Sequence, residues 1–302
     1  MTDKKICPVC SGENTRTFIK GGSPEIMRCG TCGFMFASPY YLQYNRKCQG
    51  CSHTCFDPGP GSRSYYSQCG KRARLSVEAR RLAHIEKLCG PLKGMRVLEV
   101  GAGAGYMASL AIQAGADYEG LEPEKNLADK SASAFPETRG KIRPFFPQEA
   151  GLKEKSYDLV IAADFLQYVP WPTGFAGSLA ALLKDGGRLY LEVPNERLLC
   201  VRNFIRRALG LYAGRTHPGN INFFSPSSLD RVLAGGGFSA IVSGQLTLIG
   251  DPARLEATFN KPPGIIVRTA AAAVAGAGLD LLLQQGSLYR LCAARSGTDA
   301  GN

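Results

Sequence analysis

The sequence predicts an α/β fold in which a mainly parallel sheet follows a small cysteine-bearing module. Three observations carry this prediction. Short apolar runs alternate with helical patterns from residue 96 to residue 295, as they do in chains built from βαβ units. A glycine-rich turn follows the first of these runs at 101–105. Two cysteine pairs of the CxxC type precede all of them, within residues 1–38.

The bulk composition is that of a globular chain with room for one large domain and a small one. The 302 residues are 44% hydrophobic and 20% charged. The N-terminus lacks the apolar region of a secretory signal, and no run is long and apolar enough for a membrane span. Eleven cysteines, beginning in CxxC pairs, indicate metal binding in a reducing cytoplasm rather than disulfides.

The net charge of +11 admits anionic partners. A basic surface can bind RNA, anionic lipid head groups or phosphorylated substrates. The basic residues are scattered, however, so a merely solvated surface explains the charge equally well.

The stretch RVLEVGAGAGY at 96–106 is the centre of the predicted site. Its apolar part reads as a buried strand, and a helical pattern follows the turn. Glycines leave the backbone bare where a ligand can meet the helix N-terminus. The spacing G-x-G-x-G differs from the dinucleotide fingerprint G-x-G-x-x-G, and Glu99 would repel a pyrophosphate but attract a cation. An ordinary tight turn and a dehydrogenase site are the alternatives.

A second acidic residue, Glu122, ends the next predicted strand at 118–122. It lies about twenty positions beyond the glycine turn, where a carboxylate can bind a ribose diol. The following strand, at 142–147, contains two prolines and is therefore expected to be short. Helices are predicted at 74–88, 107–114, 125–135, 175–183 and 226–234, the last with Ser225 as N-cap.

Another buried strand is predicted in YDLVIAADFLQYV at 157–169. Asp164 and Phe165 fall where this strand reaches the ligand-binding edge, because ligands lie beyond the carboxyl ends of parallel strands. Further strands are predicted at 189–195, 239–242 and 287–295.

These segments resemble a known family. EVGAGAG resembles motif I of class I S-adenosylmethionine (SAM) dependent methyltransferases, and 157–169 resembles their motif IV, commonly F-D-x-V-x-x-x-x-V-L-E-H-V. KDGG at 184–187 looks like the family's L-K-P-G-G turn. The resemblance implies a seven-stranded Rossmann-like methyltransferase sheet with an antiparallel last strand, SAM as cofactor, and a methyltransferase domain at 76–302.

The resemblance also implies where SAM binds. Glu99 would lie near the methionine portion and Glu122 on the ribose, while Phe146 is an adenine candidate by position only. The complete set of implied cofactor residues is Glu99, Gly101, Gly103, Gly105, Tyr106, Glu122, Pro123, Phe146, Asp164 and Phe165.

The residues that would carry catalysis depart from the family pattern. Gln167 and Tyr168 stand in place of the usual acidic residue and histidine, so an activity that depends on this histidine is in doubt, and Tyr168 is a hydrogen-bonding candidate. The stretch 217–229 resembles the family segment H-x-x-F-F-S-P-x-S-L, with Asn220 at the histidine position. His217 is the general-base candidate, although a surface histidine explains it equally well.

The N-terminal cysteines have the spacing of a zinc ribbon. Two CxxC knuckles can complete a tetrahedron of thiolates, and a module of this size depends on its metal to fold. The ligands would be Cys7, Cys10, Cys29 and Cys32. A connector at 39–75 carries either free thiols or a second metal site formed by Cys48, Cys51, Cys55 and Cys69.

The leading functional hypothesis is SAM-dependent methyl transfer to a small-molecule or glycan-type acceptor, such as a sugar, polysaccharide or natural-product precursor. The first alternative is an rRNA or tRNA methyltransferase whose ribbon and basic surface hold RNA. The second is a SAM-binding scaffold without catalysis. The basic amphipathic segment 197–211 reads as a lid helix, or as a contact with a membrane surface or an anionic substrate.

Overall fold

The computed structural model of this chain describes residues 6–19, 25–37, 68–196, 220–247 and 286–295, together with residues 264, 265, 269, 270 and 273. Several sequence-based predictions fall outside the described residues and stay predictions. These are the basic segment 197–211, the general-base candidate His217, and the proposed second metal cluster of Cys48, Cys51, Cys55 and the side chain of Cys69.

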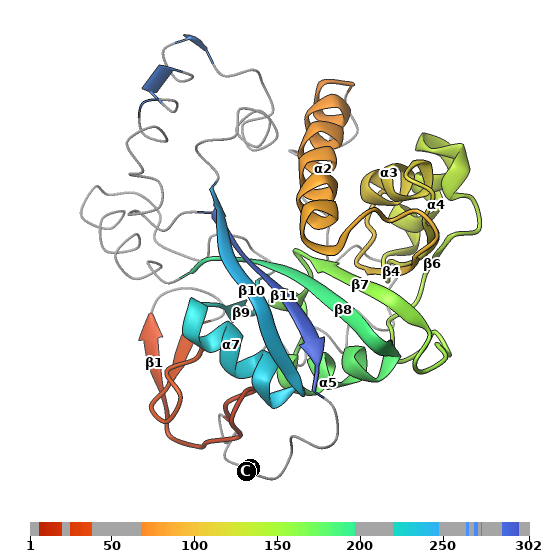
Figure 1. The fold of residues 1–302 in the computed structure, drawn as a ribbon. Helices are drawn as coiled ribbons and strands as arrows, with labels where there is room; N and C mark the ends of the chain where they lie inside the picture. Colours follow the sequence, from red (N-terminus) through yellow and green to blue (C-terminus); the bar gives the residue numbers. More distant parts are fainter. Residues whose placement is uncertain are drawn as a thin grey trace.

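A seven-stranded sheet forms the centre of the described structure (Figure 1). Its order is β10-β11-β8-β7-β4-β5-β6, and β11 is antiparallel to both of its neighbours while β4 to β8 run parallel. The predicted seven-stranded sheet with an antiparallel last strand is therefore confirmed. The strands are β4 (Arg96–Val100), β5 (Asp117–Leu121), β6 (Ile142–Arg143), β7 (Tyr157–Ala163), β8 (Leu183–Pro194), β10 (Phe238–Thr247) and β11 (Gly286–Ala294).

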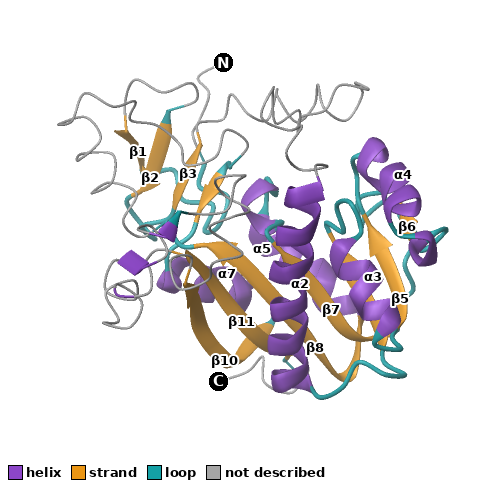
Figure 2. Ribbon diagram, turned by 90° about the horizontal axis from the view of Figure 1, so that it is seen from above, coloured by secondary structure: helices purple, strands orange, loops and turns teal. Residues whose placement is uncertain are grey.

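Helices cover both faces of this sheet (Figures 1 and 2). Successive side chains of a strand point to opposite faces. Val97 of β4 accordingly packs in the core under α2 and α3, whereas Leu98 and Val100 pack in the core under α5 and α7. One face carries α2 (Gln68–Cys89), α3 (Tyr106–Gln113) and α4 (Lys125–Ala134), and the other carries α5 (Pro172–Leu182) and α7 (Pro226–Gly235).

Most element boundaries agree with the sequence prediction, and the exceptions are α2, which begins at Gln68 rather than at the predicted residue 74, and the strands β8 and β10. The predicted turn at 184–188 lies within β8, where the pairing with β7 jumps from Leu183 to Arg188. Strand β10 extends beyond the predicted 239–242 because it pairs with β11 along its whole length. The N-cap prediction is confirmed: Ser225 caps α7 in a capping box with Ser228.

The N-terminal strands form a second, antiparallel sheet of order β1-β2-β3-β9. Its fourth strand, β9 (Asn222–Phe223), comes from the segment just before α7. Cys7 and Phe36 lie in the same apolar core as Leu229 of α7. The ribbon is thus packed against the α5 and α7 side of the main sheet. Its own strands are β1 (Thr15–Ile19), β2 (Ile26–Cys29) and β3 (Met35–Ala37).

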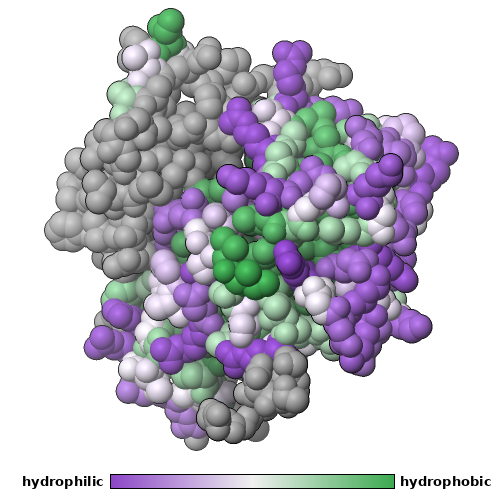
Figure 3. All heavy atoms as spheres, viewed as in Figure 1, coloured by the Kyte–Doolittle hydropathy of each residue, from purple (hydrophilic) through white to green (hydrophobic). Residues whose placement is uncertain are grey.

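The surface of the face shown in Figure 3 is largely hydrophilic, with an apolar patch near its middle. Among the described large apolar side chains, Ile241 on the edge strand β10 is 53% exposed. None of the helices in the described ranges combines the length and apolarity that crossing a membrane requires.

Candidate active site and metal centre

The three glycines of the turn after β4 adopt backbone conformations that other residues avoid. Gly101, Gly103 and Gly105 have φ angles of 84°, 54° and 81°, in the left-handed region that glycine enters without steric cost. At Gly101 a Cβ would also lie 2.6 Å from the ring of Phe165. The sequence G-x-G-x-G is therefore required by the turn itself, which leads directly into α3.

Glu122 reaches back from the end of β5 into this turn. The Gly103 N–H donates to Oε2 at 2.8 Å, and the Glu124 N–H donates to Oε1 at 2.9 Å. Burial raises the pKa of Glu122 to about 7, although both of these hydrogen bonds lower it. Each carboxylate oxygen keeps a further lone pair. These lone pairs fit the two hydroxyls of a ribose, which is the role predicted for Glu122.

Glu99 lies buried on the face of β4 that α2 covers, with 5% of its surface exposed. Its carboxyl accepts a hydrogen bond from the Tyr118 hydroxyl. Burial raises the pKa of Glu99 to about 8, and the bond from Tyr118 opposes this shift. Tyr118 engages Oε2, which leaves Oε1 for a ligand. At a pKa of about 8 the carboxyl is mostly protonated at neutral pH in the free protein, and a cationic ligand would favour its ionised form.

A buried arginine, Arg81 of α2, joins three carboxylates at this edge of the sheet. Its Nε and Nη2 bind Glu192 at 2.8 and 3.2 Å, Nη2 also binds Asp164 at 2.9 Å, and Nη1 binds both oxygens of Glu78 at 2.7 and 2.6 Å. All five N–H donors of the guanidinium are thereby used. Burial lowers the pKa of Arg81, but the three carboxylates outweigh it and hold the pKa well above its usual value.

The sequence analysis does not identify this arginine cluster. Three carboxylates around one guanidinium leave an excess of negative charge, which favours a cationic ligand nearby. A signal was present in the sequence, because Glu192 interrupts the apolar run of β8. In the structure this side chain is completely buried. A carboxylate in that position requires a buried cation.

Asp164, the residue after β7, has φ 53°. A non-glycine residue in this region is strained, and such strain is concentrated at functional sites. Its N–H donates to the Glu192 carbonyl at 2.9 Å, and its carboxylate accepts from Arg81. Phe165, the next residue, packs on Gly101 and on Phe175, with ring centroids 5.6 Å apart in the second contact. The structure thus brings Gly101, Asp164 and Phe165 together.

Other predicted cofactor residues lie around this centre. Tyr106 begins α3 and is buried against Phe135, with ring centroids 5.2 Å apart. Pro123 follows Glu122 and is half-buried. Phe146 lies beyond β6 and is 37% exposed. Pro123 and Phe146 add no polar side-chain group, and the roles of all three residues in binding stay predictions.

Tyr168, a catalytic candidate, ends the short helix η3 (Leu166–Tyr168) that follows Phe165. Burial, and then the nearby Asp164, raise the pKa of Tyr168 to about 12. Its hydroxyl therefore stays protonated at neutral pH. It is suited to donate a hydrogen bond and poorly suited to act as a general base.

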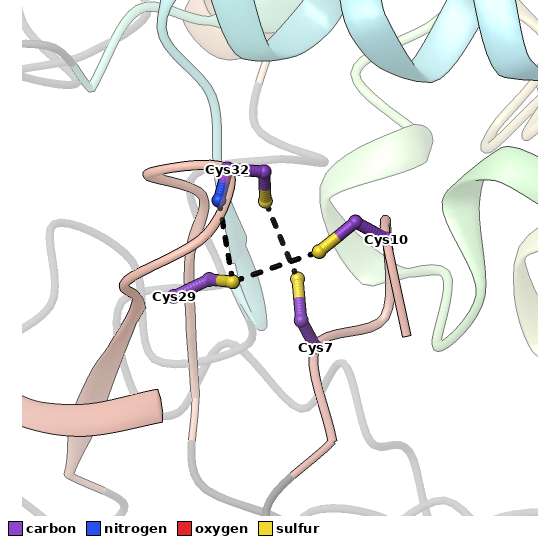
Figure 4. Close-up of side chains that lie close together, drawn as sticks. All are labelled: Cys7, Cys10, Cys29 and Cys32. Atoms are coloured by element: carbon purple, nitrogen blue, oxygen red, sulfur yellow. Dashed lines mark hydrogen bonds between the residues drawn. The ribbon is translucent and has the colours of Figure 1, made fainter. Parts of the chain in front are cut away.

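The four N-terminal cysteines converge on one point (Figure 4). Their Sγ atoms all lie within 4.8 Å of one another, and the Cys7–Cys32 and Cys10–Cys29 pairs are each 3.6 Å apart. Tetrahedral zinc–sulfur bonds of about 2.3 Å require sulfur atoms about 3.8 Å apart. The pairs are too far apart for a disulfide of about 2.05 Å. The geometry fits a closed tetrahedral site.

In the second knuckle the electrostatics favour a thiolate at Cys29, whereas burial raises the pKa of Cys32 to about 11. Burial alone would raise the pKa of Cys29. The backbone N–H groups of Cys32 and Thr31 point at its sulfur and lower the pKa to about 7. The Cys32 N–H lies 3.5 Å from this sulfur. Amide donors of this kind stabilise metal-bound thiolates in tight turns.

Comparison with known proteins connects this geometry to a family. The model of a methyltransferase domain family matches residues 72–243, more than half of the chain. A ubiquinone biosynthesis O-methyltransferase from Bordetella avium is 32% identical over 136 residues, which cover 40% of this chain and 52% of that protein. One from Aliivibrio fischeri is 29% identical over 159 residues, covering 51% and 68%. The chain spans about half the length of the Bordetella protein.

Solved structures show the same fold at low sequence identity. The cyclase SpnF superposes with a TM-score of 0.51 at 17% identity, covering 72% of this chain and 82% of that one. A possible histamine N-methyltransferase from Thermotoga maritima has a TM-score of 0.50 at 17% identity and covers 84% and 100%. Such likeness establishes the fold alone. Together with the family match and the motif I turn, it shows that the chain belongs to the methyltransferase domain family, with a four-cysteine cluster of zinc-ribbon type at its N-terminus.

Proposed function

We propose that the protein transfers a methyl group from SAM to a hydroxyl of a small molecule. The observation that carries this proposal is Glu122, which two backbone N–H groups hold in the glycine turn with lone pairs left for a ribose diol. The arginine cluster supports it, because its excess negative charge suits a cationic cofactor. A pyrophosphate-bearing dinucleotide would be repelled by the same charge.

The chain's residues would act mainly by positioning. SAM, when bound, supplies a methyl group activated by its sulfonium charge. The glycine turn exposes its backbone to the cofactor beside the start of α3, and Glu122 fixes the ribose. Asp164 is held by Arg81 at the edge of this space. Holding two reactants in line lowers the entropic part of the barrier, which is the main contribution expected of such a site.

On the acceptor side, we propose that Tyr168 donates a hydrogen bond to the acceptor. Its raised pKa supports this role over that of a base. His217 stays our candidate for the group that removes the acceptor proton. The two roles predict different pH profiles, since a histidine titrates near pH 6.5 whereas Tyr168 does not titrate below about pH 12.

The acceptor class is inferred from the curated relatives. Their names describe O-methyl transfer in ubiquinone biosynthesis, which supports an oxygen of a small molecule as the acceptor and does not single out sugars. A screen for S-adenosylhomocysteine should therefore include phenols, sugar nucleotides and an RNA sample. We expect turnover with a phenolic or sugar hydroxyl. RNA turnover would favour the RNA methyltransferase, and SAM binding without turnover on any acceptor would favour the scaffold.

Loss of the Glu122 carboxylate should weaken cofactor binding. Glu122→Ala is expected to reduce the affinity for SAM by about 1–3 kcal/mol, the contribution of hydrogen bonds to a charged group. Calorimetric titration measures this directly. Glu124→Ala is the matched control, because this carboxylate lies at the start of α4 and caps it. Equal affinities for the Glu122 variant and the unmodified protein would contradict the assignment.

The pH dependence of binding tests the same residue. The pKa of Glu122 is about 7 in the free protein, and the ribose requires the ionised carboxylate. Below pH 7 binding must first remove a proton, so the dissociation constant should rise about fivefold between pH 7 and pH 6 and about tenfold per pH unit below that. Above about pH 8 this contribution should disappear. Glu122→Gln should bind more weakly and lack this slope; a slope that persists in the variant would assign it to another group.

We also propose that the cysteine cluster holds zinc. The supporting observations are the converging sulfur atoms and the amide donors at Cys29. A closed set of four thiolates leaves no open coordination position, so we assign the metal a structural role. Within this proposal residues 1–38 are the ribbon, 39–75 the connector and 76–302 the methyltransferase domain.

A further inference from the structure

The cysteine ribbon and the turn that carries Tyr168 are joined by one short strand, β9. On one side, Phe36 of β3 pairs with Asn222 of β9. On the other side, the Ile221 N–H donates to the Gln167 carbonyl of η3 at 3.0 Å. Strand β9, the fourth strand of the ribbon sheet, therefore connects this sheet to η3, the short helix that follows Asp164 and Phe165.

The side chain of Asn222 makes the closest polar connection to this segment. Its Nδ2 donates to the Val169 carbonyl at 2.6 Å and to the Leu166 carbonyl at 3.1 Å. These carbonyls belong to the first residue of η3 and to the residue after it, and the Leu166 carbonyl also accepts the Val169 N–H at 3.2 Å. The amide nitrogen brings two hydrogens to two carbonyls from one atom without placing a charge in the interior. Asn222 is 1% exposed, so water cannot easily replace it.

The orientation of the Asn222 amide is set by these two bonds. Within the described part of the chain its Oδ1 is buried and has no hydrogen-bond partner. A buried carbonyl without a donor is unfavourable. The structure accepts this cost to keep both donated bonds, which indicates that holding η3 is the function of this side chain.

The connection extends from Asn222 to the metal ligands. Cys29 ends β2, and its N–H donates to the Phe34 carbonyl at 2.9 Å, which closes the second knuckle onto β3. Cys7 and Cys29 also share one apolar core with Leu166 and Val169. A bound metal would hold the two knuckles together, and through β3 and β9 it would fix the donors that η3 depends on.

We propose that Asn222 is a positioning residue through which the metal-loaded ribbon holds η3, and with it Tyr168, in place. Metal occupancy then controls the acceptor side of the active site, while the hydrogen bonds that hold Glu122 come from Gly103 and Glu124 and involve no ribbon residue. The assignment of η3 and Tyr168 to the acceptor side rests on the proposed methyl transfer. The coupling between metal and η3 does not.

Hydrogen exchange in the full chain tests this coupling. The Tyr168 and Val169 N–H groups donate within η3, to Phe165 and Leu166, and their exchange can be followed by mass spectrometry. With Zn²⁺ bound, these amides should be protected, and removing the metal with a chelator should accelerate their exchange at least about tenfold. Amides of β4 should be unaffected. Unchanged exchange in η3 after complete metal removal would overturn the proposal.

Variants separate Asn222 from the metal. Asn222→Asp replaces the donor by an acceptor and should accelerate exchange in η3 while zinc content stays at that of the unmodified protein. Asn222→Ser keeps one donor, offers a second variant should the first not fold, and should show an intermediate rate. Asn126→Asp is the matched control, because Asn126 is exposed on α4. Protection of η3 in both Asn222 variants would contradict the proposal.

Turnover provides a readout that a purely structural role would not give. With an acceptor identified in the screen, Asn222→Ser should raise the KM for the acceptor at least about tenfold and leave SAM affinity within about twofold. If no acceptor is turned over but η3 responds to metal and to Asn222, the proposed function fails and the coupling stands. If turnover is found but η3 ignores both, the coupling alone fails.

Discussion

Arg81→Met should destabilise the protein by about 3–5 kcal/mol, because it leaves a fully buried carboxylate without its cation. Glu192 has no exposed surface and receives two of the five N–H donors of Arg81. The Tyr190 hydroxyl, 3.3 Å from Oε2, would be its main remaining donor in the described structure. Methionine fills a similar volume, so a cavity contributes little. Chemical denaturation measures the change in unfolding free energy.

A double variant identifies the cause of this loss. Adding Glu192→Gln to Arg81→Met removes the stranded charge and should restore much of the stability, since the two residues form one network. Arg81→Lys keeps the charge but lacks the planar guanidinium that binds three carboxylates. Its loss of stability should therefore lie between that of Arg81→Met and that of the double variant. Lys125→Met is a control, because Lys125 pairs with Asp129 on the surface and should change stability by less than about 1 kcal/mol. Arg81→Met without loss of stability would mean that the cluster is not the anchor we describe.

Removal of the metal should have the second large effect. Structural zinc in small modules contributes about 10 kcal/mol or more of apparent binding free energy at neutral pH. The ribbon shares its apolar core with α5 and α7. Chelation should therefore unfold the N-terminal sheet and also lower the melting temperature of the remaining chain, as followed by circular dichroism. Elemental analysis should find at least one zinc per chain before chelation.

Single cysteine variants provide the matched comparison. Cys32→Ser removes one ligand and should abolish tight zinc binding. Cys89→Ser changes a thiol at the end of α2, outside the cluster, and should leave zinc content unchanged. Equal zinc content and melting temperature in both variants would contradict a metal centre built from Cys7, Cys10, Cys29 and Cys32. A melting temperature that does not respond to chelation would show that the shared core holds without metal.

The parts of the site that were predictable lie on consecutive βα units. Glycines at alternate positions predict a turn with positive φ angles. Glu122 follows at a nearly fixed spacing because one helix separates two neighbouring parallel strands. The boundary of β7 at Ala163 was predictable from its continuous apolar run, which placed Asp164 at the ligand-binding edge. Local chemistry was sufficient in each case. The CxxC spacing predicted the cysteine cluster in the same way.

The parts that were not predictable depend on contacts between distant residues. Arg81 lies 111 positions from Glu192 and 83 from Asp164, and nothing in an amphipathic helix says which of its arginines turns inward. The pairing of β3 with β9 is also remote, and a two-residue strand leaves no periodic pattern. The strain at Asp164 cannot be read from the sequence, because only its neighbours hold a non-glycine residue at positive φ.

The sequence by itself determined the fold class, the glycine turn, the carboxylate at its edge and the set of four thiols, because each depends on short-range spacing and on the geometry of one turn. Only the tertiary structure decided how these parts are connected. It placed a buried arginine among three carboxylates, buried Tyr168 beside Asp164 so that its pKa is raised, and paired β9 with the ribbon next to η3. The physical reason is the same throughout: burial and pairing charge depend on which distant segments meet, and a single strand's sequence does not encode its neighbours.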